Sequence, residues 1–401
     1  MLLDGLRVIE MGVWVAGPSA AGVMADWGAD VIKVEPPVGD PFRGLFGTLG
    51  YDSGLPNPPF ALDNRGKRSV VLDLQRPGGP EVMQRILATA DVFVTNLRPD
   101  ALERLSLSPD ELAKRHPRLI YASVTGYGLS GPDRNRPSYD VGAFWARTGI
   151  ARQLVPPDTP PPGIRGGLGD HATGLATVAG VLAALLERER TGRGRLVETS
   201  LLRTGMYCLG WDLGIQLMLG KVAPASPRED NPAPLVNCYR SGDDRWFFLL
   251  GLEADRHFPG LLRAIGRPEL ASDPRFSTAA ARRSSRAELI AILDQEFAKA
   301  DLDEWAKRFE ADDVWWAPAQ TPAEAVEDPQ AHAVGAFVDV EGTGEGPGFK
   351  AIASPVHFHG IPQGHAGPVP GLGEHTESFL AELGLSPSEL DRLRQEGAIP
   401  S

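Results

Sequence analysis

The chain of 401 residues has little cysteine and no excess of positive charge. It contains two cysteines, Cys208 and Cys238, and no CxxC pair, so neither a disulfide framework nor a thiolate metal site is expected. With 40 Lys and Arg against 52 Asp and Glu, the net charge is −12. Because nucleic-acid binding needs clustered cations that neutralise phosphates, this balance argues against a nucleic-acid partner.

Long apolar runs and targeting signals are also missing. No uninterrupted apolar run reaches 18 residues, so we expect no membrane span. The N-terminal stretch carries Asp4, Arg7 and Glu10 and lacks a preceding basic region, which is typical of a first strand and not of a signal peptide. The length and the 42% of hydrophobic residues suit two globular domains. Together these features predict a cytoplasmic protein.

Three widespread catalytic motifs, GxSxG, HExxH and GxxxxGKS/T, do not occur, so the common hydrolase, zinc-protease and P-loop classes have no support. The segment GYGLSG (126–131) has the glycine spacing of a dinucleotide-binding turn, but the following PDRNRPSYD does not begin a helix. We interpret it as a turn. His357 and His359 form a single spaced pair, which is weak evidence for a metal, and no metal site is predicted.

Strand and helix patterns alternate through the first half of the chain. Short β-branched runs predict strands at residues 6–12, 29–35, 67–74, 91–97 and 119–128. Apolar residues at helical spacing predict helices at residues 19–28, 79–90 and within 99–117, the last with Ser108 or Asp110 as an N-cap. This alternation is typical of a parallel sheet with crossover helices.

The character of the sequence changes after about residue 225. A strand is predicted at 245–253, followed by amphipathic segments around 255–265, 286–300 and 302–310. This part is expected to form a separate α+β domain.

Asp170 stands out among the acidic residues because it ends the glycine-rich segment GIRGGLGDHATG (163–174). It precedes an apolar helix predicted at 173–190, which we expect to be buried. Aspartate commonly fills a helix N-cap, and that interpretation is open. A carboxylate at a helix N-terminus is also held ionised by the backbone amides, and flanking glycines leave room for a bulky substrate. Both features suit a carboxylate nucleophile.

Segments along nearly the whole chain match one protein family. They are LRVIEMGVWVAGP, WGADVIKVEPP, NRGKRSVVLDL, DVFVTNLRPDALERL, RLIYASVTGYGLSGP, GGLGDHATG, LLERERTGRGRLVETSL and GPVPGLGEHTESFLAELG. On these motifs the chain resembles the class III CoA-transferases. That family includes the formyl-CoA:oxalate, carnitine and bile-acid CoA-transferases and their relative α-methylacyl-CoA racemase.

The resemblance implies an α/β fold built as an interlocked homodimer, in which each chain threads through a hole in the other. Residues 1–205 would form a large Rossmann-like CoA-binding domain completed by residues 331–401. Residues 225–325 would form the smaller α+β domain, with linkers at 206–224 and 326–330.

The resemblance also implies the chemistry. Asp170 is expected to attack an acyl-CoA thioester, forming a mixed anhydride and then an aspartyl-CoA thioester from which a carboxylic acid collects the CoA. No cofactor beyond the CoA substrate is implied. The positions that match CoA-binding residues of the family are Val15, Ala16, Leu72, Asp73, Leu74, Gln75, Asn96, Leu97, Arg98, Arg104, Arg136, Pro137, Ser138 and Tyr139. The arginines among them suit the nucleotide phosphates.

Several departures from the family pattern bear on the substrate. The oxalate enzymes have a glutamine where this chain has Val15 and an arginine where it has Pro36, for which Arg43 is a candidate replacement. Their glycine-rich lid has no counterpart in residues 231–246. Oxalate or formate is therefore not expected as the natural partner. Candidates for a roomy apolar pocket, or simply for core aromatics, are Trp14, Phe144, Trp145 and Trp211.

The racemases pair their aspartate with a histidine placed just before another aspartate, where this chain has Tyr139 before Asp140. Two-base proton exchange would lack one of its bases, so transfer is expected over racemisation. The alternatives are an acyl-CoA racemase or epimerase, and a catalytically silent CoA-binding protein.

Overall fold

The computed structural model describes residues 1–50, 57–342, 348–361 and 367–401. These residues form two compact units. The larger unit comprises Met1–Ala151, Gly163–Val222 and Ala333–Ser401, and the smaller comprises Arg152–Pro162 and Ala223–His332.

The larger unit is built on a six-stranded parallel sheet of order β3-β2-β1-β4-β5-β6. The strands are β1 Arg7–Met11, β2 Asp30–Glu35, β3 Arg68–Val71, β4 Val92–Thr95, β5 Ile120–Thr125 and β6 Leu196–Ser200. The five strands that the sequence predicts are confirmed, and β6 was not anticipated. The strand order reverses between β1 and β4, and in sheets of this kind ligands bind beyond the carboxyl ends of the strands at that point.

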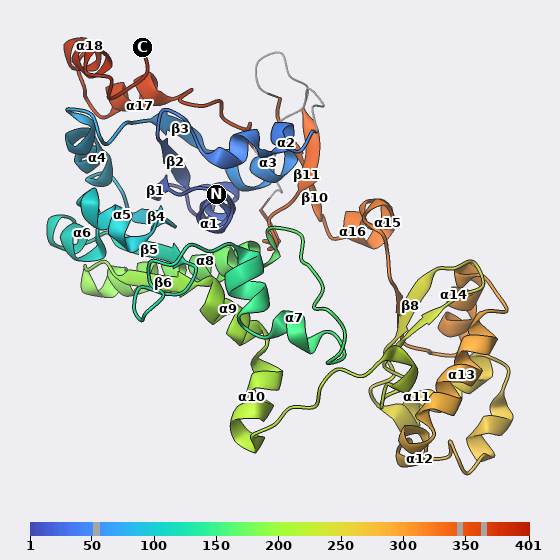
Figure 1. Ribbon diagram of the computed structural model, residues 1–401. Coiled ribbons are helices and arrows are strands. Elements are labelled where there is room, and N and C mark those ends of the chain that lie inside the picture. Colours follow the sequence, from blue (N-terminus) through green and yellow to red (C-terminus); the bar gives the residue numbers. More distant parts are fainter. Residues whose placement is uncertain (51–56, 343–347, 362–366) are drawn as a thin grey trace. The chain divides into compact units, whose positions relative to one another are not determined.

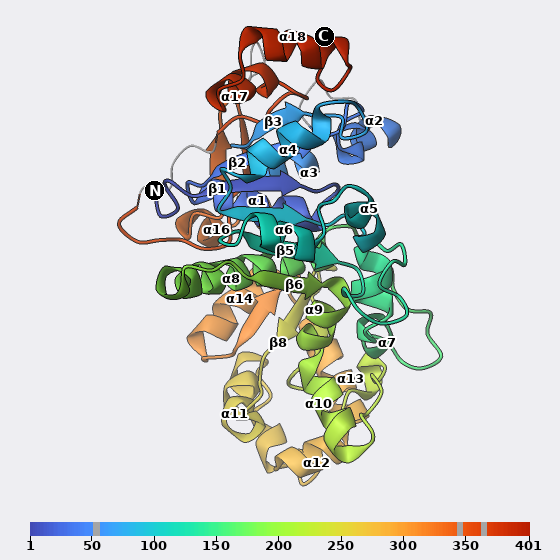
Figure 2. The same cartoon turned by 90° about the vertical axis from the view of Figure 1, so that its left-hand side faces the viewer.

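Helices cover both faces of the sheet (Figures 1 and 2). One face carries α1 Ala16–Asp26, α3 Pro58–Asn64 and α8 Leu168–Thr191. The other carries α4 Gly79–Leu87, α5 Pro99–Arg104, α6 Pro109–Arg115, α17 Thr376–Glu382 and α18 Pro387–Gln395. Successive residues of β1 serve the two layers: Val8 packs with α1 and α8, and Ile9 with α4 and α17. This alternation explains why the strands read as continuous apolar runs. Of the two predicted N-caps, Ser108 and Asp110, the structure has Ser108, which forms a capping box with Glu111 at the start of α6.

The C-terminal segment returns to the edge of the sheet, where α17 and α18 lie near β3 and α4 in both views (Figures 1 and 2). The backbone N–H of Val71 donates to Thr376 Oγ1 at 3.0 Å, and that of Asp73 donates to the carbonyl of Ala398 at 2.8 Å. A two-stranded antiparallel ribbon, β10 Phe337–Val340 and β11 Phe349–Ile352, precedes this return.

The helix α8 is long and apolar enough to cross a membrane by length and composition alone. Its buried residues include Val178 and Val181, which pack with α1 and the sheet, so it serves as a core helix of the larger unit. The expectation that residues 173–190 are buried is correct for one face and wrong for the other, where Leu175 and Leu186 are exposed. The reason is that α1, the sheet and the neighbouring α9 cover a single side of α8.

Two segments expected to be linkers hold helices instead. Residues 206–224 include the end of α9 Leu201–Cys208 and all of α10 Gly210–Leu219, which Gly220 ends in the left-handed conformation at φ 74°. Residues 326–330 include the end of α15 Pro322–Glu327 and the start of α16 Pro329–Ala333. Each of these last two helices begins with a proline, whose fixed φ suits the first helical position.

The remaining short helices of the larger unit lie in the connections that follow β2 and β5. They are η1 Pro41–Gly44, α2 Leu45–Thr48, the π-helix η2 Val141–Ala146 and α7 Ile150–Gln153, whose second half is counted with the smaller unit.

The smaller unit has a three-stranded antiparallel sheet, β7 Cys238–Arg240, β8 Trp246–Leu249 and β9 Trp316–Pro318, in the order β7-β8-β9. Its helical segments are η3 Arg228–Asp230, α11 Ala254–Ala264, η4 Pro268–Ser272, α12 Ala279–Ser284, α13 Arg286–Phe297, α14 Leu302–Ala311 and α15. Phe247, Phe297 and Phe309 form the centre of an aromatic core. The segment 152–162 belongs here and not with the large domain, because Gln153 Nε2 donates to the carbonyl of Ala223 at 2.9 Å.

Candidate active site

A cavity of about 400 Å³ lies beyond the carboxyl ends of β1, β4 and β5 in the larger unit. Its walls come from the loops that follow these strands and from the first turn of α8. The lining residues are Val13, Trp14, Ala16, Asn96, Leu97, Arg98, Pro99, Val124, Thr125, Gly126, Arg134, Arg136, Pro137, Ser138, Tyr139, Asp170 and Leu201. The position is the one that this sheet topology favours for ligands.

Asp170 enters the cavity from the first turn of α8 and is not its N-cap. Gly167 occupies the N-cap position at φ 99°, and its N–H donates to Asp140 Oδ2 at 2.9 Å. A side chain at Gly169 would overlap the ring of Phe144, so that glycine allows η2 to pack directly against the helix start. The N-cap interpretation is therefore wrong, and the glycines instead place Asp170 at the cavity wall.

Burial and the nearby Asp140 carboxylate raise the pKa of Asp170 to about 7, while His171 opposes the rise. This is opposite to the direction expected from the helix N-terminus alone, because desolvation outweighs the favourable dipole. Among the described residues, no donor hydrogen-bonds to the Asp170 carboxylate. A carboxylate with a strongly perturbed pKa at a cavity wall is typical of a functional group.

His171 follows Asp170 and lies against a different group. Its Nε2 is 3.0 Å from Asp63 Oδ1 at the end of α3, and the Asp63 side chain is almost fully buried. Although burial disfavours the imidazolium, the Asp63 carboxylate raises the pKa of His171 above its ordinary value.

The loop between β1 and α1 is held in a strained conformation at the cavity. Trp14 has φ 63°, which is unusual for a residue other than glycine, and its N–H donates to Asp40 Oδ1 at 3.0 Å. The Asn96 side chain makes two hydrogen bonds to Val13, the residue before Trp14. Its Oδ1 accepts from Val13 N–H at 2.9 Å, and its Nδ2 donates to the Val13 carbonyl at 2.7 Å. The amide of Asn96 thus supports the cavity wall.

Beneath this loop lies a buried network of charges. Glu10 accepts from Lys33 Nζ at 2.7 Å and from Lys67 Nζ at 2.6 Å, and Lys33 also lies 3.0 Å from Asp40. Burial opposes the ionisation of Glu10, but the two ammonium groups hold its pKa below the ordinary value. Since Lys67 also donates to the carbonyl of Pro18 at 2.8 Å, the network fixes the end of β1 to the start of α1.

Aromatic side chains form one side of the cavity. The rings of Trp14 and Tyr139 meet edge to face at 5.6 Å, and Trp14 lies 6.0 Å from Phe42. Of the other sequence candidates for an apolar pocket, Phe144 and Trp145 pack in a separate cluster around η2, and Trp211 is 85% exposed on α10.

Three arginines line the cavity. Arg98 begins α5, and Arg134 and Arg136 lie in the loop after β5. Arg134 pairs with Glu103 at 2.6 Å, whereas Arg136 lies 3.6 Å from Asp133 and is largely exposed. Guanidinium groups of this kind can take phosphate oxygens in a bidentate manner.

The structure brings together nine of the residues that the sequence suggested: Ala16, Asn96, Leu97, Arg98, Arg136, Pro137, Ser138, Tyr139 and Asp170. Six others lie outside its lining: Val15, Leu72, Asp73, Leu74, Gln75 and Arg104. Val15 is buried against Phe42 and Phe60, and Leu72 is in the core beside α4. Residues 73–75 follow the edge strand β3, and Arg104 is exposed at the end of α5.

Arg134, Thr125, Gly126 and Leu201 line the cavity without having been anticipated. Thr125 and Gly126 lie near the carboxyl end of the strand predicted at 119–128, and β5 ends at Thr125, so the rule that ligands bind beyond the carboxyl ends of parallel strands would have found them. Leu201 follows β6, the strand that the sequence analysis missed.

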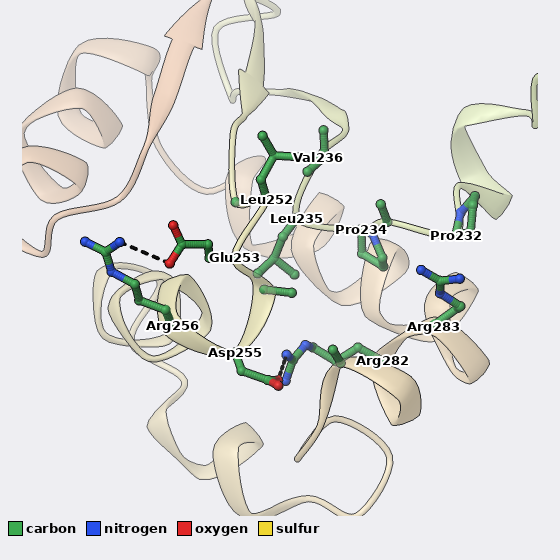
Figure 3. A pocket seen from close by; sticks show the side chains of 14 residues that line it. Pro232, Pro234, Leu235, Val236, Leu252, Glu253, Asp255, Arg256, Arg282 and Arg283 are labelled. Carbon is green, nitrogen blue, oxygen red and sulfur yellow. Dashed lines mark hydrogen bonds and ion pairs between the residues drawn. The ribbon is translucent and has the colours of Figure 1, made fainter. Parts of the chain in front are cut away.

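The smaller unit has a cavity of about 520 Å³ between the segment 232–236 and the start of α11 (Figure 3). Its acidic side chains are engaged, since Glu253 pairs with Arg256 at 3.1 Å and Asp255 pairs with Arg282. This cavity contains none of the residues that the sequence suggested for catalysis or CoA binding.

A doubly wound sheet with a buried carboxylate and arginines at its carboxyl edge is typical of α/β enzymes. The family model described as CoA-transferase family III matches residues 3–376, and the chain belongs to that family. It is an enzyme of this class, which confirms the resemblance seen in the sequence.

Named relatives agree with that membership. The chain is similar to the (R)-2-hydroxy-4-methylpentanoate CoA-transferase of Clostridioides difficile, with 31% identity over 100% of both chains. It is 33% identical to the cinnamoyl-CoA:phenyllactate CoA-transferase of Clostridium sporogenes, covering 98% of this chain and 96% of that one. A crystal structure of a CAIB/BAIF family protein from Brucella suis superposes with a TM-score of 0.82 at 30% identity, covering 95% and 99% of the two chains.

Proposed function

We propose that the protein moves CoA from an acyl-CoA thioester to a free carboxylic acid, with Asp170 as the covalent nucleophile. The observation that carries this proposal is the position of the Asp170 carboxylate. It lies at the wall of a cavity at the carboxyl edge of the sheet, and no donor of the described residues occupies it. Its pKa of about 7 leaves a large fraction ionised at neutral pH.

The proposed chemistry has two matched halves. A carboxylate oxygen of Asp170 attacks the thioester carbonyl, the carbon–sulfur bond breaks, and CoA leaves as a thiolate from a mixed anhydride. The thiolate attacks the Asp170 carbonyl, releasing the donor acid as its carboxylate and leaving an aspartyl-CoA thioester. The acceptor carboxylate then attacks this thioester and expels the thiolate, which attacks the acceptor carbonyl and frees Asp170. Each step exchanges one acyl bond for another and no atom changes its oxidation state, so no cofactor beyond the CoA substrate is proposed.

Binding of CoA is assigned to the lining of this cavity. Arg98, Arg134 and Arg136 would contact the phosphates, and the start of α1 at Ala16 offers backbone amides. The sequence-predicted positions Leu72–Gln75 lie at the same carboxyl edge but two strands away from β1, and would contact only a far part of an extended ligand.

Transfer is favoured over racemisation because the second base is missing. Tyr139 stands in the cavity where a racemase would need a histidine, and a phenol is a poor base near neutral pH. Because burial raises the pKa of Asp170, its ionisation at neutral pH destabilises the folded protein. A silent CoA-binding protein would have no need of a carboxylate with this cost.

We propose further that the chain forms an interlocked homodimer. The support is the exposure of several large apolar side chains on α9 and α10, of the kind that often marks a protein–protein contact. They are Tyr207, Trp211, Leu217, Met218 and Leu219. Tagged and untagged dimers mixed under native conditions should give no heterodimer within hours, and ready exchange would contradict interlocking.

The function is tested by Asp170→Asn and Asp170→Ala, with the exposed Asp158→Asn as a matched control. A panel of acyl-CoA donors and free acids, read by mass spectrometry, first supplies an active pair. Both Asp170 variants should lose transfer while still binding CoA. Retention of a tenth or more of the activity, a barrier change under about 1.4 kcal/mol, would place the nucleophile elsewhere.

A further inference from the structure

The cavity of the smaller unit combines an apolar wall with a group of charged side chains (Figure 3). Its volume of about 520 Å³ lies in the range of small-molecule sites. The apolar wall comes from the segment 232–236, which includes two prolines, and from Leu252, which is 81% exposed. The charged side chains come from the start of α11 and from α12, and they are Glu253, Asp255, Arg256, Arg282 and Arg283.

One cation of this cavity is left over once its ion pairs are counted. Glu253 pairs with Arg256 at 3.1 Å, and Asp255 pairs with Arg282. The Arg283 guanidinium is exposed and makes no ion pair or hydrogen bond to any of the described residues. In Figure 3 it points away from both acidic side chains. The cavity therefore carries one net positive charge, which favours an anion.

Arg282 supplies a further unused donor and is fixed in place. Its side chain is 3% exposed. Nη1 donates to the carbonyl of Phe276 at 2.7 Å, Nη2 donates to Asp255, and the guanidinium lies over the Phe258 ring at 4.4 Å from its centroid. Its Nε has no hydrogen-bond partner in the part of the chain that the structure describes. Because a buried N–H without an acceptor is unfavourable, this side chain favours an acceptor in the cavity that it lines.

The helix α11 begins at the same cavity without a side-chain cap. It has 11 residues, and its N-cap Glu253 makes no side-chain hydrogen bond to it. The N–H groups of Ala254 and Asp255, which both line the cavity, donate to no acceptor of the described residues. Free N–H groups and the helix dipole make such an end attractive to anions. The cavity thus has three sources of positive potential, namely Arg283, Arg282 and the start of α11.

We propose that this cavity binds an organic carboxylate. Its carboxylate group is taken by Arg283, Arg282 and the start of α11, and its apolar body lies against the segment 232–236 and Leu252. The apolar wall favours an organic acid over inorganic phosphate, which would bury none of that wall. All of these residues belong to the smaller unit, and none of them lines the cavity that Asp170 enters. The proposal therefore goes beyond the proposed function and does not depend on Asp170 as the nucleophile.

Photoaffinity labelling locates the bound acid in the full chain. The probe is a benzoic acid that carries a trifluoromethyl diazirine, and the labelled peptides are mapped by mass spectrometry. Labelling should fall on residues 232–236 or 252–256, and phenylacetate should displace it whereas the neutral phenylacetamide should not. The same labelling is expected in Asp170→Asn, which separates this inference from failure of the proposed function. Labelling confined to the cavity of the larger unit, or equal displacement by the amide, would overturn the proposal.

The phenylacetate concentration that halves the labelling of these peptides measures the affinity of this site alone. Arg283→Gln removes the unpaired charge from an exposed position and should weaken binding by about tenfold. Leu252→Asp should also weaken it, because it places a negative charge in the apolar wall. The matched control is Arg240→Gln, an exposed position on β7 outside the cavity lining, which should bind like the unmodified protein. Unchanged affinity in Arg283→Gln, or displacement by inorganic phosphate as effective as that by phenylacetate, would contradict the proposal.

Discussion

The Asp140 carboxylate accepts a hydrogen bond from the N–H of Gly167 at 2.9 Å, and so caps the loop that delivers Asp170 to the cavity. The same carboxylate raises the pKa of Asp170 by repulsion. One side chain therefore both fixes the nucleophile in place and makes it harder to ionise. These two effects can be separated experimentally, because asparagine keeps an acceptor oxygen and removes the charge.

Asp140→Asn should shift the rise of kcat/KM with pH toward lower pH. Asp170 must be ionised to react, and removal of a neighbouring negative charge lowers its pKa from the value of about 7. At pH 6 the variant should gain activity relative to the unmodified enzyme, and at pH 8 the two should be similar. An unchanged midpoint would mean that the limiting ionisation is not that of Asp170.

The raised pKa of Asp170 also has a consequence for stability. The folded-state pKa of about 7 lies above the ordinary value of 3.8, so ionisation destabilises the fold progressively as pH rises between these values. Asp170→Asn should therefore stabilise the protein by about 1–2 kcal/mol at pH 8, after allowance for partial exposure, and leave it nearly unchanged at pH 4. Urea unfolding at the two pH values measures this. Equal stability of the two proteins at pH 8 would contradict the burial argument.

The buried network under the β1–α1 loop predicts a large loss of stability in Glu10→Gln. Lys33 and Lys67 would keep their charges without the carboxylate that neutralises both, at a cost of about 3–5 kcal/mol. The matched control is Glu382→Gln, which breaks half-exposed pairs with Arg7 and Arg68 and should cost under about 1 kcal/mol. Similar losses in the two variants would show that the buried network contributes no more than a surface pair.

Much of the large sheet was predictable because parallel strands buried on both faces are written as short β-branched runs, as in β1 and β2. The strand β6, Leu196–Ser200, was missed because it is short and partly exposed, and Glu198 and Thr199 interrupt its apolar residues. The end of α8 itself was readable, since Gly192 takes a left-handed conformation there.

The candidate site was predictable where it depends on glycine and aspartate, as at Gly167 and Asp170. The electrostatic state of the site was not, because it depends on residues far apart in sequence. Asp63, Asp140 and His171 come from three elements, and only the fold brings their charges together. The same holds for Val15, whose buried position against Phe60 depends on the packing of α3.

The acceptor should be a bulky or apolar acid and not oxalate. Trp14 and Tyr139 line the cavity that Asp170 enters, and Val15, where the oxalate enzymes have an amide, is buried with Phe42 and Phe60 next to Trp14. The second carboxylate of a buried oxalate would lack a donor there, at a cost of about 1–3 kcal/mol. Steady-state comparison of oxalate with an aromatic or steroid acid, each against its own CoA ester, measures the preference. An equal or higher kcat/KM for oxalate would contradict it.

Covalent trapping at Asp170 tests the central claim most directly. The protein is incubated with an acyl-CoA donor and hydroxylamine in the absence of acceptor, digested, and mapped by mass spectrometry. Because hydroxylamine attacks anhydrides and thioesters, the account predicts a hydroxamate on Asp170 that depends on the donor and disappears in Asp170→Asn. Continued CoA transfer with no modification of Asp170, or with the modification on another residue, would contradict it.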